Sequence, residues 1–115
     1  MNKLMQPASA GRPEEEKFYV VDSDAMAWGD GGGEGFLSKE LLYSEDGRGA
    51  HLIKVEPGAY AGSHSHDRIE HLFVLEGDFY DQNQTYKKGD FVVREAGANH
   101  IAGSKNGALI FLMFI

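Results

Sequence analysis

Residues 58–77 read GAYAGSHSHDRIEHLFVLEG, a stretch that carries two histidines and a glutamate within seven positions. In an α-helix, His64 and His66 would point about 200° apart around the axis and could not reach one ion. In an extended chain, side chains two residues apart share a face, so His64, His66 and Glu70 lie on the same side. The spacing therefore favours a β-strand that presents candidate metal ligands on one face.

The same face continues into apolar residues. Leu72 and Val74 follow Glu70 with the same parity, whereas His71 has the opposite parity and is expected to point away. Two imidazoles, a carboxylate and then apolar side chains are typical of the mouth of a β-barrel that leads into a packed interior. The alternative is that the two histidines are exposed loop residues that bind nothing.

A further ligand has to come from elsewhere in the chain, and His100 is the candidate. It ends the segment GDFVVREAGANH, in which a strand-like run is followed by a turn at Gly97. If residues 78–100 fold back as a hairpin, His100 lies beside the first cluster. Arg94 in this segment has two interpretations, contact with an anionic substrate or a solvated strand end.

Turn-forming residues recur about every 8–12 positions from Phe18 onward, and the segments between them are rich in strand-forming residues. This pattern is typical of an all-β sandwich or barrel. No segment has the periodicity of a long amphipathic helix. We expect strands at 18–21, 36–43, 50–56, 70–76, 78–80, 90–94 and 108–115, and glycine-rich turn chemistry at 29–35.

The chain length fits one domain, because 115 residues lie within the commonest domain size of about 100–150. Residues 1–17 contain Pro7, Pro13 and three consecutive glutamates, with no periodic apolar pattern. We therefore expect a flexible N-terminal arm over residues 1–17. The single domain is expected to span residues 18–115.

Composition limits the possible chemistry and partners. The chain has no cysteine, which excludes disulfides, thiolate zinc sites and thiol catalysis, so a metal would be held by nitrogen and oxygen. The net charge of −7 and the lack of a basic cluster disfavour nucleic acid and anionic membrane surfaces. No apolar run approaches the roughly 20 residues of a membrane span, and no signal peptide is evident, so we expect a cytoplasmic protein.

One motif of the chain resembles the first motif of the cupin superfamily, G-x5-H-x-H-x3/4-E-x6-G. The match has no departure: Gly58 opens it, Gly77 closes it, and His64, His66 and Glu70 stand at the ligand positions. The motif is highly specific for the fold and for the metal ligands, and much less so for the reaction, because cupins support many chemistries.

A second stretch resembles the second cupin motif, G-x5-P-x-G-x2-H-x3-N. Gly89, Gly97 and His100 match it, whereas Glu95 and Ser104 stand where the family has proline and asparagine. Neither of these two positions is a ligand in the pattern, so the departures bear on the shape of the loop. More narrowly, Trp28, the phrase HLFVLEGDFYDQNQTYKKGDFV and the ending AGANHIAGSKNGALIFLMF are similar to the ChrR-type cupins.

The resemblance implies a fold and a metal site. The fold is an all-β double-stranded β-helix, a jelly-roll-like barrel with the metal inside near one end. The implied ligands of one divalent ion are His64, His66, Glu70 and His100, which leave a position open for water or substrate. Fe, Zn, Mn, Ni and Cu all suit these donors, so the identity of the metal is left open.

The resemblance also implies a choice of functions. ChrR-type cupins resemble both the cupin-like domain of zinc-binding anti-sigma factors and small dioxygenases that cleave β-diketones or hydroxyacetophenones. We expect a metal-dependent, Fe-type dioxygenase whose small-molecule substrate is a diketone or a phenolic ketone. The alternatives are a non-enzymatic regulatory or sensor domain of the anti-sigma-factor type, and a metal-dependent isomerase or decarboxylase.

Two residues are candidates for proton transfer in such an enzyme. Glu70 could loosen from the metal and act as a base, and His51 could assist, because it shares a strand face with Ile53 and Val55. The alternative for His51 is an ordinary core histidine.

A homodimer is expected from the two most apolar segments. In HLFVLE and ALIFLMFI, residues of both parities are hydrophobic, so both faces of these strands are expected to be covered. A single small barrel buries its inner face only. A second copy related by a twofold axis is the usual way to cover the outer face.

Overall fold

The computed structural model of the chain describes residues 4–5 and 20–115, which form ten strands and one short 3-10 helix. Apart from Leu4 and Met5, which pair with Tyr43 and Ser44, the arm expected over residues 1–17 lies outside the described residues. No helix within the described ranges is long and apolar enough to cross a bilayer. The elements are β1 Leu4–Met5, η2 Ser23–Ala25, β2 Gly29–Gly33, β3 Phe36–Ser44, β4 Gly49–Val55, β5 Tyr60–His64, β6 Glu70–Tyr80, β7 Thr85–Lys87, β8 Phe91–Arg94, β9 His100–Gly103 and β10 Ala108–Phe114.

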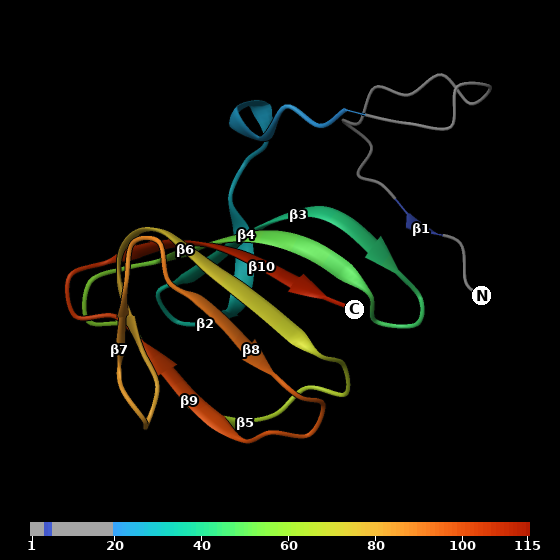
Figure 1. The fold of residues 1–115 in the computed structure, drawn as a ribbon. Helices are drawn as coiled ribbons and strands as arrows, with labels where there is room; N and C mark the ends of the chain where they lie inside the picture. Colours follow the sequence, from blue (N-terminus) through green and yellow to red (C-terminus); the bar gives the residue numbers. More distant parts are fainter. Residues whose placement is uncertain (1–3, 6–19) are drawn as a thin grey trace.

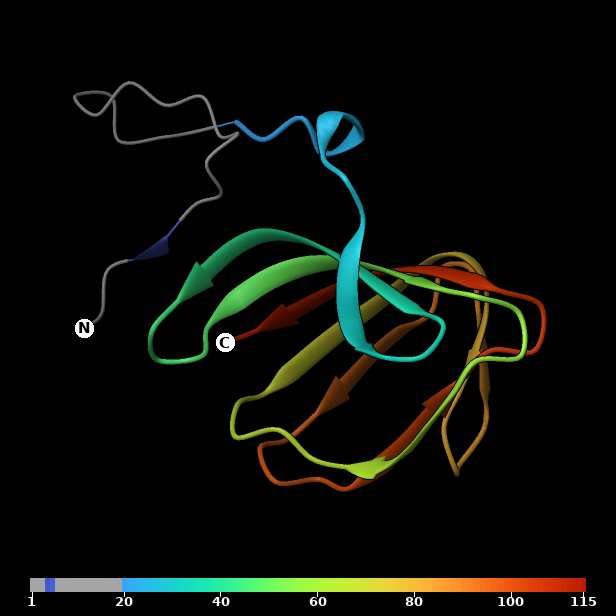
Figure 2. The same ribbon diagram turned by 180° about the vertical axis from the view of Figure 1, so that it is seen from behind.

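The strands form one antiparallel sheet that curls on itself. The order along the sheet is β1-β3-β4-β10-β6-β9-β5, with β2 on β3 and with β7 and β8 on β6. Figures 1 and 2 show β3, β4, β10 and β6 side by side in one curved layer, with β9 and β5 opposite them. This confirms the expected all-β, jelly-roll-like barrel.

Strand β6 links the two layers of the barrel. Its first part pairs with β10 and β8, and its last three residues pair with β7. It bends at Gly77, which has φ +78°, and a Cβ there would lie 2.0 Å from the carbonyl oxygen of Gly107. Only glycine fits this position. The sequence predicted two strands here, at 70–76 and 78–80, whereas the structure has one bent strand.

The side chains of β6 alternate as predicted. Leu72 and Val74 point inward and are 3% and 0% exposed, whereas Phe73 points outward and is 39% exposed. The inward residues pack with Val55 and Ile110 of the neighbouring strands in the core. Burying each of these aliphatic side chains stabilises the fold by about 1.5–3 kcal/mol. The apolar core therefore begins immediately beyond Glu70.

Several short strands were not predicted. Residues 29–33 were expected to be turn, but they form β2, which pairs with β3. Gly31 makes this possible, because a Cβ there would lie 2.6 Å from the backbone of Phe36. Strands β5, β7 and β9 have few large apolar residues, so their pairing partners rather than their own composition fix them as strands. Of the predicted strand 18–21, only residues 20 and 21 are described.

Candidate metal centre

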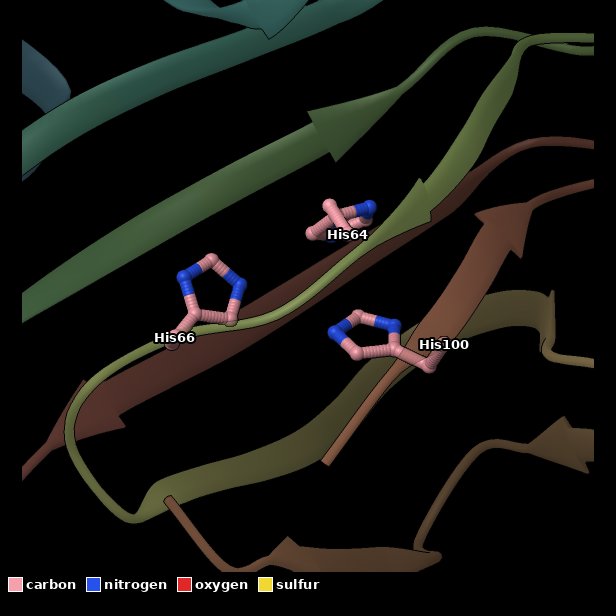
Figure 3. Close-up of side chains that lie close together, drawn as sticks. All are labelled: His64, His66 and His100. Atoms are coloured by element: carbon pink, nitrogen blue, oxygen red, sulfur yellow. The ribbon is translucent and has the colours of Figure 1, made fainter. Parts of the chain in front are cut away.

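Neighbouring strands and one loop bring the histidines together. His64 ends β5 and lies directly opposite His100, the first residue of β9. His66 lies in the loop after β5, and its carbonyl oxygen accepts a 2.8 Å hydrogen bond from the backbone N–H of Gly97. This bond joins the loop of the first motif to the loop of the second. Figure 3 shows the three imidazoles facing one another.

The route by which His100 reaches the cluster differs from the prediction. Residues 78–100 are not a single hairpin, because β7 pairs with the end of β6 and β8 returns along its beginning. His100 then follows on β9, which pairs with β5. His100 therefore lies beside His64 as predicted, but the predicted single hairpin over residues 78–100 was wrong.

The three imidazoles are positioned as metal ligands. One ring nitrogen from each of His64, His66 and His100 lies within 4.8 Å of the others. Nδ1 of His64 is 2.7 Å from the carbonyl oxygen of Gly62, and Nδ1 of His100 is 3.1 Å from that of Ile101. A carbonyl only accepts, so both Nδ1 atoms carry the proton and both Nε2 lone pairs are free. Metal-binding histidines are usually oriented in this way.

Glu70, the first residue of β6, borders the three-histidine cluster but is not part of the group of mutually close ligand atoms. Its side chain is 4% exposed, and Oε2 lies 3.3 Å from Nε2 of His66 and 3.4 Å from Nε2 of His100. Two donor atoms that bind one ion at about 2.1 Å are separated by about 3.0–3.4 Å. Oε2 of Glu70 and Nε2 of His100 are also buried without a hydrogen-bond partner among the described residues. A cation between these two buried atoms would satisfy both of them, so these residues fit a divalent metal.

The pKa shifts of His66 and Glu70 suit metal binding. Burial lowers the pKa of His66, and the nearby His64 and His100 act in the same direction, whereas Glu70 opposes them. Burial alone would raise the pKa of Glu70. Interactions with His100 and Arg94 lower this pKa by more than burial raises it, so the pKa lies below its ordinary value. A neutral imidazole and a carboxylate are the forms that bind a metal.

Behind Glu70 lies a buried ion network. Arg94 stands directly opposite Glu70 in the β6–β8 register, and its Nη1 donates to Oε1 of Glu70 at 2.6 Å. Nη2 of Arg94 donates to Oδ2 of Asp81 at 2.9 Å, and the hydroxyl of Tyr86 donates to the same oxygen at 2.7 Å. The side chains of Arg94 and Asp81 are 9% and 2% exposed. Arg94 is therefore not a solvated strand end, and both of its bonded nitrogens face carboxylates.

The network makes an acid-dependent contribution to stability. Burial would raise the pKa of Asp81, but the hydrogen bond from Tyr86 and others at this carboxyl lower it more, so the pKa is below its ordinary value. Such a group stabilises the fold above its unfolded pKa of about 3.9 and loses this contribution as pH falls through the lower folded value. Asp81→Asn is expected to lower the free energy of unfolding by about 2 kcal/mol at neutral pH. Urea denaturation at about pH 3 should show a smaller difference, and an equal difference at both pH values would contradict this account.

The candidate metal site opens onto an apolar cavity of about 500 Å³. Glu70, His64, His66 and His100 all line it, and most of the other lining residues are aliphatic or aromatic. Among the described residues that line it, none is a lysine, an arginine or an aspartate. The other lining residues are Gly31, Gly32, Gly33, Phe36, Ile53, Tyr60, Ala61, Gly62, Leu72, Phe79, Ala102, Ile110 and Leu112.

The two other histidines lie away from this cluster. His51 does not line the cavity; its ring centroid is 6.1 Å from that of Phe114, which in turn lies 4.8 Å from the ring of His66. Burial lowers the pKa of His51. His71 stacks on Phe91 at 6.0 Å on the other face of β6, as its parity predicted. A catalytic role for His51 therefore stays a prediction.

The two departures from the second motif have different surroundings. Ser104 is 1% exposed, and its hydroxyl donates to the carbonyl oxygen of Asp78 at 2.5 Å and accepts from the backbone N–H of Gly107 at 2.8 Å. It thus stabilises the turn that leads into β10. Glu95 is exposed, and its carbonyl oxygen accepts from Ala98 in the turn before His100.

Sequence reasoning missed the network of Arg94, Asp81 and Tyr86. A signal was present in the sequence, because period-two alternation in FVVR places Val92 and Arg94 on one face of the strand. In the structure this face points inward, whereas Phe91 and Val93 on the other face are 60% and 52% exposed. A charged residue on an inward face needs a partner. The register that places Glu70 opposite Arg94 could not be read from the sequence.

Solved structures with the same architecture are numerous, and three illustrate their range. An RmlC-like cupin from Shewanella frigidimarina is 20% identical, with a TM-score of 0.74 and coverage of 92% of both chains. A protein provisionally assigned as an acetylacetone dioxygenase from Methylibium petroleiphilum is 18% identical, with a TM-score of 0.76 and coverage of 85% of this chain and 76% of the other. Likeness at these identities shows the fold alone.

The third structure is the complex of SigE with the anti-sigma ChrR from Rhodobacter sphaeroides, with 19% identity and a TM-score of 0.68. The alignment covers 80% of this chain and 51% of the other, so this chain spans about half the length of the one that it matches. No curated protein is significantly similar to this chain in sequence. The family model of the ChrR cupin-like domain matches residues 16–114, almost the whole chain. The chain therefore belongs to the ChrR cupin-like family, and it carries a candidate three-histidine metal site.

Proposed function

We propose that the protein is a metal-dependent, Fe-type dioxygenase that acts on a small neutral diketone or phenolic ketone. The observation that carries the proposal is that the three clustered histidines and Glu70 line an apolar cavity of about 500 Å³. A cavity of this size suits a small ligand. The absence of cationic side chains among the described lining residues disfavours a substrate with a carboxylate or phosphate.

The chain's own residues would bind and orient such a substrate. Phe36, Ile53 and Ile110 supply apolar wall for the carbon skeleton and keep water out. The substrate's oxygens would face the three histidines that also line the cavity. A divalent ion held there supplies Lewis acidity toward those oxygens and, if it is iron, the capacity to react with O2. Glu70, whose pKa is below its ordinary value, would stay a carboxylate and balance charge, which makes it a weak base.

One structurally similar protein suggests which substrates to assay. The Methylibium petroleiphilum structure, provisionally assigned as an acetylacetone dioxygenase, has the highest TM-score of the three compared above, 0.76. At 18% identity this likeness supports the choice of substrates to test and no more.

Oxygen uptake tests the proposal. Protein reconstituted anaerobically with Fe(II) and then given acetylacetone is expected to consume one O2 for each diketone cleaved. His66→Ala is expected to remove this activity, and His71→Ala, a histidine of similar exposure on the opposite face, is expected to keep it. A dihydroxyacetophenone is the second substrate to assay. Metal-loaded protein that consumes no O2 with either substrate class would overturn the dioxygenase proposal.

A regulatory role is the second candidate, favoured by the family match and by the structural match to the complex of SigE with the anti-sigma ChrR. In this case the metal site would stabilise a domain that binds a protein partner. Affinity capture from cell extract that recovers one stoichiometric partner, from protein that is inactive in the oxygen assay, would favour this function. A metal-dependent isomerase or decarboxylase is compatible with the same site, and product analysis without O2 would identify it.

The proposed assembly is a homodimer. The outer face of β6 and β8 exposes Phe73, Phe91 and Val93, which are 39%, 60% and 52% exposed in the single chain. Covering these side chains would stabilise an association between copies. Sedimentation equilibrium is expected to give twice the monomer mass of 12.7 kDa, and Phe91→Lys is expected to shift the protein toward monomer. A cytoplasmic location stays a prediction.

A further inference from the structure

The two carboxylate oxygens of Glu70 have different surroundings. Oε1 is 2.6 Å from Nη1 of Arg94, on the side away from the histidines. Oε2 faces His66 and His100 and has no hydrogen-bond partner among the described residues. One oxygen is therefore already bonded within the protein, and the other is available.

Arg94 is held in place from its other side. Its Nη2 bonds to Asp81, whose carboxylate also accepts the hydroxyl of Tyr86 at 2.7 Å and the backbone N–H groups of Asn83 and Gln84 at 2.8 and 3.2 Å. A planar guanidinium with two partners in fixed positions has little freedom to rotate. Arg94 and Asp81 are also nearly inaccessible to water, so water cannot readily replace either bond.

The charges in this network also distinguish the two oxygens of Glu70. Glu70, Arg94 and Asp81 together carry two negative charges and one positive charge, and all three side chains are at least nine-tenths buried. Oε1 of Glu70 and the carboxylate of Asp81 are both bonded to the guanidinium, so Oε2 of Glu70 is left without a hydrogen-bond partner. A cation is therefore attracted to Oε2 and to the histidines, not to the middle of the carboxylate.

We propose that Arg94 is a positioning residue that restricts Glu70 to one metal-binding oxygen. With Oε1 bonded to the guanidinium, Glu70 would offer one oxygen to a metal instead of two. The inference rests on the metal site and not on the reaction. Its test therefore uses metal binding and spectroscopy, which can fail independently of the oxygen-uptake assay.

Co(II) is a suitable probe, because its visible absorption weakens as its coordination number rises. In Arg94→Met, Oε1 of Glu70 is released, and we expect the Co(II)-loaded variant to absorb more weakly than the parent protein. We also expect it to hold Co(II) at least as tightly in competition with a chelating dye, because Glu70 can then bind through both oxygens. A residue with a merely structural role would, when removed, loosen the metal.

Asp81→Asn is the matched control. It removes the negative charge behind Arg94 but keeps a hydrogen-bond acceptor for Nη2, so Arg94 still reaches Glu70 and the Co(II) spectrum is expected to match the parent. A parental spectrum in Arg94→Met, or equal spectral changes in both variants, would overturn the proposal.

A measurement on the unmodified protein covers the case in which Arg94→Met does not fold. The infrared difference between Zn-loaded and metal-free protein reports the carboxylate that binds. A wide separation of its two stretching bands indicates one bound oxygen and supports the proposal. A narrow separation indicates two bound oxygens and overturns it.

Discussion

Replacing His66 by alanine is expected to weaken divalent metal binding by more than the roughly 10–100-fold that follows loss of a residue behind a ligand. Nε2 of His66 lies 3.3 Å from Oε2 of Glu70, so the change would remove one of the proposed metal ligands itself. The side chain is 37% exposed, and its backbone bond to Gly97 does not depend on the ring, so the fold should persist. Competition with a chelating dye, followed by elemental analysis, measures the effect.

The control is His71→Ala. His71 adjoins Glu70 in sequence, is also partly exposed, and stacks on Phe91 on the opposite face of β6. It should keep full metal affinity. Equal weakening in the two variants would show that metal binding depends on general stability, and it would remove the support for the ligand assignment.

Replacing Gly77 by alanine is expected to lower the free energy of unfolding by about 2–5 kcal/mol, a large part of the stability of a small domain. The residue has φ +78°, where an alanine is strained by about 1–2 kcal/mol. The added Cβ would also lie 2.0 Å from the carbonyl oxygen of Gly107, and relieving an overlap of this kind costs about 1–3 kcal/mol more. Urea denaturation measures the difference.

Gly89→Ala separates the two causes. Gly89 has φ +93° but nothing within 4 Å of its hypothetical Cβ, so only the backbone strain of about 1–2 kcal/mol applies. Similar losses at both positions would contradict a steric requirement at Gly77. The final glycine of the first motif would then matter through its backbone angle alone.

The sequence predicted the fold wherever alternation was long and apolar. In β6, the inward Leu72 and Val74 and the outward Phe73 follow directly from period-two parity. It failed where a strand has little apolar character, as in β2, whose sequence GDGGG has no large side chain and which is a strand through its pairing with β3. It also failed to anticipate that Gly77 bends one strand instead of separating two, since that bend depends on the approach of Gly107.

The candidate metal ligands could be predicted from the spacing of the two sequence motifs. The prediction that one extended strand carries His64, His66 and Glu70 on a single face was wrong, because β5 ends at His64, His66 lies in the following loop and Glu70 begins β6. The spacing of the two motifs, not parity, identified these residues and His100, and all four side chains line the cavity. The partner of Arg94 could not be predicted, because the bond to Glu70 depends on the register of β8 against β6. A shift of one residue would have turned Arg94 to the outside.

The central claim is that one divalent ion binds to His64, His66, His100 and Glu70. Its most direct test is an anomalous-difference map from crystals grown with Fe(II) or Zn(II), recorded at the absorption edge of the metal. We expect one peak per chain, about 2.0–2.2 Å from the three Nε2 atoms and from Oε2 of Glu70. A metal-loaded crystal with no peak among these four atoms, or with its peak elsewhere on the chain, would contradict the account.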